Sequence, residues 1–281
     1  MRINHHVSVI APRRAFRPLA AAGVPVHGES SGRDEIYLIF DIHEDDPRWP
    51  AVASWIADVG ADDWVSATFS DEEVVAARLS AVRPNWFDCE PYPTPGTSGY
   101  LDVTFDRTAY CEMCGIGARQ KAPFRFRREP RWGRHAVMGL YAGFGEVFVR
   151  ADVYAEVFAP HGVAARPVVR SGDRVLETVV QLDVNEVVEF KTRGLEVADG
   201  LTRCPACHQR KYDWVQRGPL PPLRRAPQGP IAWAEPWFGS GLKAERYLLL
   251  SQPVARAIVA AKLRGAVLHP VAEPVRRARR R

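Results

Sequence analysis

The sequence has few cysteines and no long apolar segment. Five of its 281 residues are Cys, and an odd count without a recognisable secretion signal argues against a disulfide framework. No apolar run approaches the roughly 20 residues that a membrane helix requires. Residues 1–16 contain only a short apolar run and no small-residue cleavage site. We therefore expect a cytoplasmic protein without a membrane span.

Common catalytic motifs are also missing. The chain has no G-x-x-x-x-G-K-[ST], G-x-S-x-G or H-E-x-x-H motif. Its histidines are scattered, and the adjacent His5 and His6 lie in a strand-like run, where neighbouring side chains point to opposite faces. The acidic run 41–46, DIHEDD, lacks the glycine and ligand spacing of a calcium loop. We interpret it as a solvated turn and expect no catalytic residue and no enzyme activity.

The net charge of +5 comes from one end of the chain. Residues 276–281, RRARRR, contain five arginines, and the remaining 33 basic residues equal the 33 acidic ones. We expect residues 274–281 to form a basic, disordered tail. Such a tail could contact nucleic acid nonspecifically, but a solvated tail is the simpler interpretation.

The order of apolar segments predicts an α+β protein with two domains. In residues 1–95, strand-like and helix-like segments alternate, and Ser70 with Glu73 forms a capping-box pattern that predicts a helix over 70–82. Residues 96–273 are predicted to form a second α+β domain, which contains the cysteine pairs and strand–helix–strand units near 147–169 and 246–271. A strand is expected over 100–106. Apart from the cysteine pairs, no internal repeat is evident.

Two C-x-x-C pairs, Cys111 with Cys114 and Cys204 with Cys207, are the most specific feature. Two such turns can supply the four thiolates of a tetrahedral zinc site, here a zinc ribbon. The glycine at 115 would let backbone N–H groups approach the sulfurs. Four thiolates fill the coordination shell, so we expect one structural Zn²⁺ per chain. The long separation between the pairs is unusual for a compact zinc ribbon.

Two alternatives for these cysteines stay open. A redox pair would require C-x-x-C at a helix start within a βαβ segment, and neither pair clearly has that setting. The pairs could also be buried independently of each other. Cys89 is expected to be a small buried apolar residue, and His208 is expected to lie beside the site without binding the metal.

Three features of the chain resemble the bacterial double-CXXCG motif family. They are the two cysteine pairs, the segment between them, VFVRADVYAEVFAPHGVAARPVV, and the terminal segment, ERYLLLSQPVARAIVAAKLRGAVLHPV. The resemblance covers residues 100–272. It departs from the family at His208, which stands where the second CXXCG would have glycine. The resemblance implies that Cys111, Cys114, Cys204 and Cys207 bind metal. It also implies a protein-binding role, since some members of the family are described as toxin immunity proteins.

The basic aromatic segment 124–134, FRFRREPRWGR, suggests a different function. Alternating cations and aromatic rings occur in proteins that bind single-stranded nucleic acid, and the same alternation occurs in an ordinary half-buried strand. The resemblance, together with the absence of catalytic motifs, implies a non-catalytic zinc protein that binds a protein partner, such as a toxin. The alternative is a nucleic-acid-binding protein that uses segment 124–134 and the arginine-rich tail.

Overall fold

The structure, a computed structural model, describes residues 1–24, 29–30, 34–94, 99–141 and 143–273. Contacts between residues divide them into two units, one formed by residues 1–70 with 215–218 and the other by 71–214 with 219–273. The predicted domain boundary at residue 95 and the predicted tail 274–281 lie outside the described residues. Both helices and strands are present, as expected for an α+β protein. None of the described helices has the length and apolarity that a membrane span needs.

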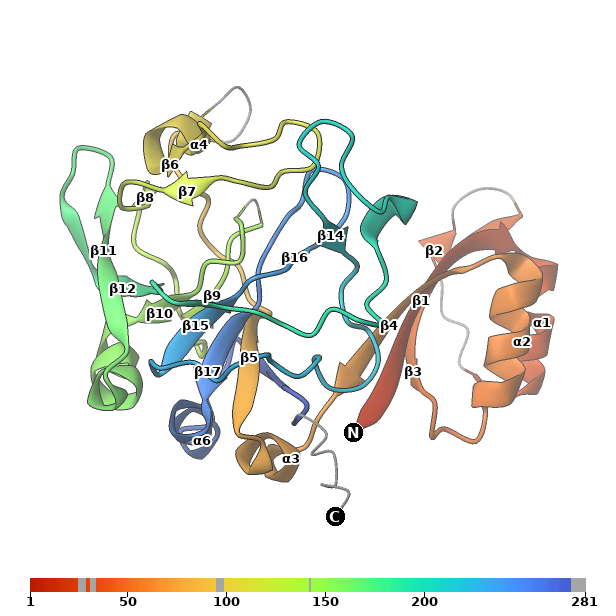
Figure 1. Cartoon of the computed structure of the whole chain (residues 1–281). Helices are drawn as coiled ribbons and strands as arrows, with labels where there is room; N and C mark the ends of the chain where they lie inside the picture. The colour runs from red at the N-terminus through yellow and green to blue at the C-terminus, as the bar shows by residue number, and fades with distance from the viewer. Residues whose placement is uncertain (25–28, 31–33, 95–98, 142, 274–281) are drawn as a thin grey trace, which may run out of the picture. The chain divides into compact units, whose positions relative to one another are not determined.

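The first unit is an antiparallel sheet with helices against one face (Figure 1). Its elements are β1 (Arg2–Pro12), η1 (Arg13–Phe16), α1 (Arg17–Ala21), β2 (Glu29–Ser30), β3 (Glu35–His43), α2 (Trp49–Val59) and β4 (Asp62–Thr68). The strand order is β2-β3-β1-β4. Val7 of β1 and Leu38 of β3 pack against Val52 and Trp55 of α2. Gly60 ends α2 in the left-handed conformation that favours glycine.

Among its described residues, the second unit contains two five-stranded sheets and two small two-stranded sheets. Its helices are α3 (Asp71–Ala76), α4 (Gly99–Thr104), α5 (Ala151–Val153), η2 (Tyr154–Phe158), η3 (Ala159–His161), η4 (Ala198–Gly200) and α6 (Gln252–Ala260). Its strands are β5 (Leu79–Pro84), β6 (Phe105–Asp106), β7 (Arg119–Gln120), β8 (Arg125–Phe126), β9 (Val137–Met138), β10 (Phe148–Arg150), β11 (Ala164–Arg170), β12 (Val175–Asp183), β13 (Val187–Val188), β14 (Lys211–Tyr212), β15 (Ile231–Ala234), β16 (Trp237–Phe238), β17 (Leu248–Ser251) and β18 (Ala266–Pro270). The large sheets have the orders β8-β11-β12-β10-β9 and β13-β15-β17-β5-β18.

Both predicted strand–helix–strand units are present, and they are built alike. In the first, β10 leads through α5, η2 and η3 to β11, and in the second β17 leads through α6 to β18. The two strands of each unit are not neighbours, because an antiparallel strand lies between them: β12 in the first unit and β5 in the second. Outside β10 lies antiparallel β9, and outside β17 lies antiparallel β15.

These correspondences reveal an internal repeat with exchanged strands. One repeat runs from β5 through the first cysteine pair to β11, and the other runs from β12 through the second cysteine pair to β18. Each repeat places its leading strand in the sheet of the other, since β5 pairs with β17 and β18 while β12 pairs with β10 and β11. Apart from the cysteine pairs, the sequence gave no sign of this repeat.

Two segments differ from the sequence prediction. The predicted helix 70–82 ends at Ala76, and Leu79–Pro84 forms β5, which is held between two strands that lie far away in the sequence. The predicted strand 100–106 is mostly helix α4, followed by the short strand β6. Helical spacing places Tyr100 and Thr104 on one buried face, where Tyr100 joins an aromatic cluster. In both segments tertiary packing overrides the local pattern.

Candidate metal centre

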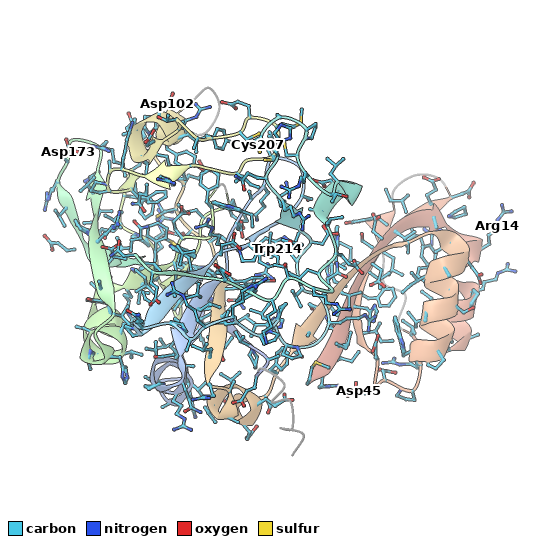
Figure 2. All side chains as sticks on the ribbon, in the orientation of Figure 1. Arg14, Asp45, Asp102, Asp173, Cys207 and Trp214 are labelled. Atoms are coloured by element: carbon cyan, nitrogen blue, oxygen red, sulfur yellow. The ribbon has the colours of Figure 1, made fainter. Side chains whose placement is uncertain are left out.

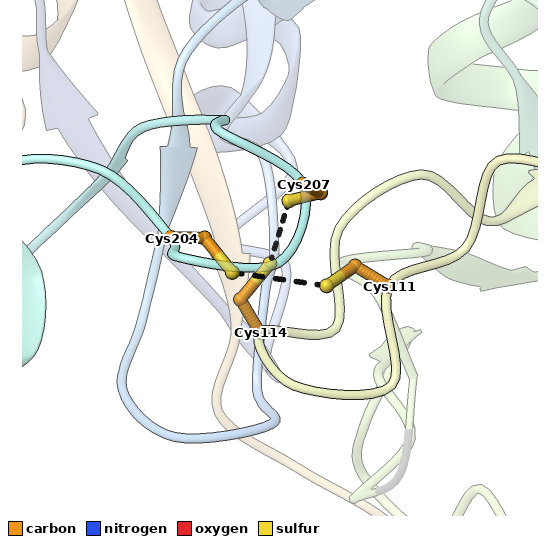
Figure 3. A group of neighbouring side chains, drawn as sticks. All are labelled: Cys111, Cys114, Cys204 and Cys207. Atoms are coloured by element: carbon orange, nitrogen blue, oxygen red, sulfur yellow. Dashed lines mark hydrogen bonds between the residues drawn. The ribbon is translucent and has the colours of Figure 1, made fainter.

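The four predicted cysteines lie together in the second unit (Figure 3). Cys111 and Cys114 belong to the loop between β6 and β7, and Cys204 and Cys207 to the loop between η4 and β14. The Sγ atoms of Cys111 and Cys204 are 3.8 Å apart, and those of Cys114 and Cys207 are 3.5 Å apart. All four sulfurs lie within 4.8 Å of one another, three of the residues are buried and Cys207 is partly buried. This convergence is inconsistent with two independently buried pairs.

Each pair sits on the same kind of turn. The N–H of Gly115 donates to the carbonyl of Cys111 at 2.8 Å, and the N–H of His208 donates to the carbonyl of Cys204 at 2.9 Å. The N–H of Cys111 donates to the carbonyl of Ile116, and the N–H of Cys204 donates to the carbonyl of Gln209. In both turns the acceptor lies five residues after the donor. Neither turn begins a helix, so the setting of a thioredoxin-like redox pair is not found in either.

Position 115 requires glycine, whereas the equivalent position 208 does not. Gly115 has a φ of 75°, and a Cβ on it would lie 2.0 Å from the carbonyl oxygen of Leu242. His208 has a similar φ of 58° but is exposed. A side chain at 208 therefore costs only the modest strain of the left-handed conformation. This difference in packing explains why only the first pair reads as CXXCG.

The electrostatics of the sulfurs differ within the cluster. Backbone N–H groups, chiefly that of Cys207, lower the pKa of the Cys204 thiol to about 7. Burial raises the pKa of the Cys114 and Cys207 thiols. The Cys204 thiolate thus forms readily, while burial opposes the ionisation of Cys114 and Cys207. A fully ionised cluster therefore needs a cation among the sulfurs.

The surroundings of the cluster supply packing and one buried positive charge. Ala244 and Trp237 pack against the cysteines. The buried ammonium of Lys211 donates to the carbonyl of Cys114 at 3.3 Å and to the carbonyl of Gly241 at 2.5 Å, and it lies 3.5 Å from a carboxylate oxygen of Asp199. Its charge offsets the negative charge that thiolates would bring to this site.

The sulfur positions match those of a four-coordinate metal site. A regular tetrahedron with metal–sulfur bonds of about 2.3 Å has sulfur–sulfur edges of about 3.8 Å. The two sulfur–sulfur contacts of 3.5 and 3.8 Å lie near that edge length. The four cysteines can therefore bind a metal ion with little rearrangement.

The basic aromatic segment 124–134 does not present its rings to solvent. Phe124 and Phe126 are fully buried and Trp132 is nearly so. Arg125 ion-pairs at 2.7 Å with Asp173, which lies at the turn between β11 and β12 (Figure 2). The alternation is that of a half-buried strand, so these rings cannot form a platform on which bases stack.

The histidines and the acidic run of the first unit are engaged with each other. His5 is buried, with Nδ1 2.9 Å from the carboxylate of Asp63 and Nε2 3.1 Å from that of Glu44. His6, predicted to lie on the opposite face, is partly exposed. Glu44 also pairs with Arg217 at 2.5 Å. Among the described residues, only the four cysteines form a group of metal-ligating side chains that could hold an ion.

Sequence patterns gave no sign that Glu146 is buried or that Arg246 is partly buried. Glu146 is buried, and this burial raises the pKa of its carboxyl to about 7. The guanidinium of Arg246 stacks on Trp237, 4.2 Å from the ring centroid. Each residue lies two positions before a core strand, β10 or β17, at equivalent places in the repeat, and neither belongs to a recognisable motif. The repeated topology is the only signal that relates them.

Comparisons of the chain with protein-family models, with curated proteins and with solved structures give no match. The resemblance to the double-CXXCG motif family therefore stays a prediction.

Proposed function

We propose that the four cysteines bind one structural Zn²⁺ and that the protein acts by binding another protein, without catalysis. The observation that carries the metal proposal is the convergence of four Sγ atoms within 4.8 Å. Thiolate ligands favour zinc, iron–sulfur clusters and copper(I), and a closed set of four at tetrahedral spacing suits zinc. Four protein ligands leave no open position for a water or substrate. The role of the metal would be to fasten the two repeats together.

A metal that joins the repeats would stabilise the fold strongly. The paired cysteines are 93 residues apart in both contacts. Cross-linking such distant points removes much conformational entropy from the unfolded chain, and metal binding contributes directly to folding where the site is absent in the unfolded state. The site would thereby order the surfaces around it for recognition of a partner.

Elemental analysis of the purified, reduced protein tests the metal proposal. We expect one zinc per wild-type chain and a large loss of zinc and thermal stability in Cys204→Ser. Cys89 lies outside the cluster, so Cys89→Ala is the matched control and should keep its zinc. A wild-type protein without zinc, or equal zinc in both variants, would refute the assignment.

We further propose that the partner is a toxin, so that the protein acts as an immunity protein. This proposal is supported by the resemblance of residues 100–272 to the double-CXXCG motif family. Expression of the neighbouring gene with and without this chain tests it. We expect that neighbour to arrest growth alone, growth to return with the wild-type chain, and the two proteins to co-elute. A neighbour that is harmless, or toxicity that this chain does not relieve, would overturn the immunity role.

A further inference from the structure

Arg246 is a partly buried cation that lies near the carboxylate of Glu235 but forms no ion pair in the part of the chain that the structure describes. Burial lowers the pKa of its guanidinium, and its Nε atom is buried without a hydrogen-bond partner. No described carboxylate forms an ion pair with it, and its guanidinium stacks on Trp237. A buried charge without a partner is costly. An anion that reached this guanidinium would recover that cost.

Two cavities adjoin the stacked pair, so an anion has access to it. One, of about 360 Å³, is lined by polar side chains and by aromatic side chains that include Phe144 and Trp233. The other, of about 340 Å³, is mostly polar and includes Arg203 and Arg210. Arg246 and Trp237 line both. We call the two cavities together the Arg246 groove.

The Arg246 groove carries surplus positive charge that the metal centre positions. Arg119 lines the first cavity and follows the first cysteine pair, while Arg203 and Arg210 line the second cavity and flank the second pair. None of these three forms an ion pair with a described carboxylate. The other two arginines of the lining are neutralised, because Arg166 pairs with Asp183 at 2.6 Å and Arg224 pairs with Glu189 at 3.3 Å.

We infer that the Arg246 groove binds an acidic segment of the partner protein, with one of its carboxylates paired to Arg246. This inference rests on the proposed protein-binding function and deepens it. Guanidinium groups match carboxylates in a planar, bidentate geometry. An arginine stacked on a tryptophan is also typical of the residues that dominate protein interfaces. The four arginines without a described carboxylate partner would favour a segment with more than one carboxylate.

A nucleic acid fits the groove less well. Glu235 lines the second cavity and Glu146 the first, and both would repel a continuous phosphate backbone when ionised. A folded protein can instead place single carboxylates on the arginines and neutral or basic groups beside the acids.

Fluorescence anisotropy tests the assignment on the zinc-loaded full chain, with a labelled peptide in which three glutamates alternate with three serines. We expect measurable binding, which Arg246→Gln weakens by about tenfold or more because hydrogen bonds to a charged group are lost. Arg210→Gln, at an exposed position, should weaken binding roughly two- to fivefold. Arg174 is exposed and lies outside the groove, so Arg174→Gln should change the affinity less than twofold. Zinc content and circular dichroism verify the fold of each variant.

Several results would overturn the inference. They are an absence of binding of this peptide at millimolar concentration, equal binding by Arg246→Gln and Arg174→Gln, and tighter binding of a thymidine hexanucleotide. If Arg246→Gln fails to fold, the peptide affinities of Arg246→Lys and Arg210→Gln are measured instead. Wild-type affinity in both variants would refute the site. If the peptide does not bind, the groove assignment is refuted even where the chain relieves toxicity. If the chain binds the peptide normally but does not relieve toxicity, only the immunity role is refuted.

Discussion

Replacement of Glu146 by glutamine should make the protein more stable at neutral pH. Glu146 is buried, and its carboxyl accepts a hydrogen bond of 2.8 Å from the N–H of Phe144. Burial raises its pKa from 4.5 to about 7, and the nearby Glu245 contributes in the same direction. The folded state therefore favours the neutral carboxyl, which glutamine imitates in shape and charge.

The direction and size of the effect follow from the two pKa values. Between the unfolded pKa near 4.5 and the folded pKa near 7, the native state binds more protons than the unfolded state. The free energy of unfolding must then fall as pH rises through this window. At about 1.4 kcal/mol per pKa unit, the whole loss is about 3 kcal/mol. Glutamine does not titrate, so Glu146→Gln should avoid it.

Urea unfolding of zinc-loaded protein at pH 5 and pH 8 measures the effect. The advantage of Glu146→Gln over wild type should grow by about 2 to 3 kcal/mol between these pH values. The thiols titrate in both proteins, so their contribution cancels in the difference. Glu177 is exposed, and Glu177→Gln should follow the wild-type profile. A Glu146→Gln advantage that does not change with pH would refute the buried neutral carboxyl.

The remaining predictions concern the turn at the first cysteine pair and the aromatic core. Gly115→Ala should lower the free energy of unfolding by about 3 kcal/mol, because a Cβ would meet the Leu242 carbonyl and the backbone is left-handed. Gly162 has the same φ but open space around it, so Gly162→Ala should cost only about 1 kcal/mol, and equal losses would contradict the packing argument. Phe124→Ala should cost about 3 to 5 kcal/mol as a core truncation. A Phe124→Ala protein of unchanged thermal stability would show that the ring is not buried.

The four candidate ligands could be predicted because the pattern of each cysteine pair is local. A C-x-x-C turn orients two sulfurs through hydrogen bonds that span only a few residues, so Cys111 and Cys114 suggested a ligand pair before any fold was known. The strands and the helix of segment 246–271 were predictable for the same reason, since apolar periodicity and Pro253 mark them.

The rest depended on contacts between distant residues. Leu79–Pro84 continued a helical pattern, and only pairing with β17 and β18 made it a strand. The local sequence around Tyr100 predicted a strand, but packing of Tyr100 in the aromatic cluster stabilises helix α4 instead. Arg246 and Glu146 are common residue types on ordinary segments, and their burial arises from the meeting of the two repeats. No local signal distinguishes them from solvent-exposed charges.

The exchange of strands between repeats also fixes when the second unit can be completed during synthesis. β5 is among the first strands of this unit to leave the ribosome, yet both of its partners belong to the last part of the chain. At a rate of roughly 5 to 20 residues per second, β5 waits about 10 to 40 seconds for β18. Its apolar residues and both of its edges stay open to wrong partners during that time. The nascent chain thus carries an aggregation-prone strand until translation is almost finished.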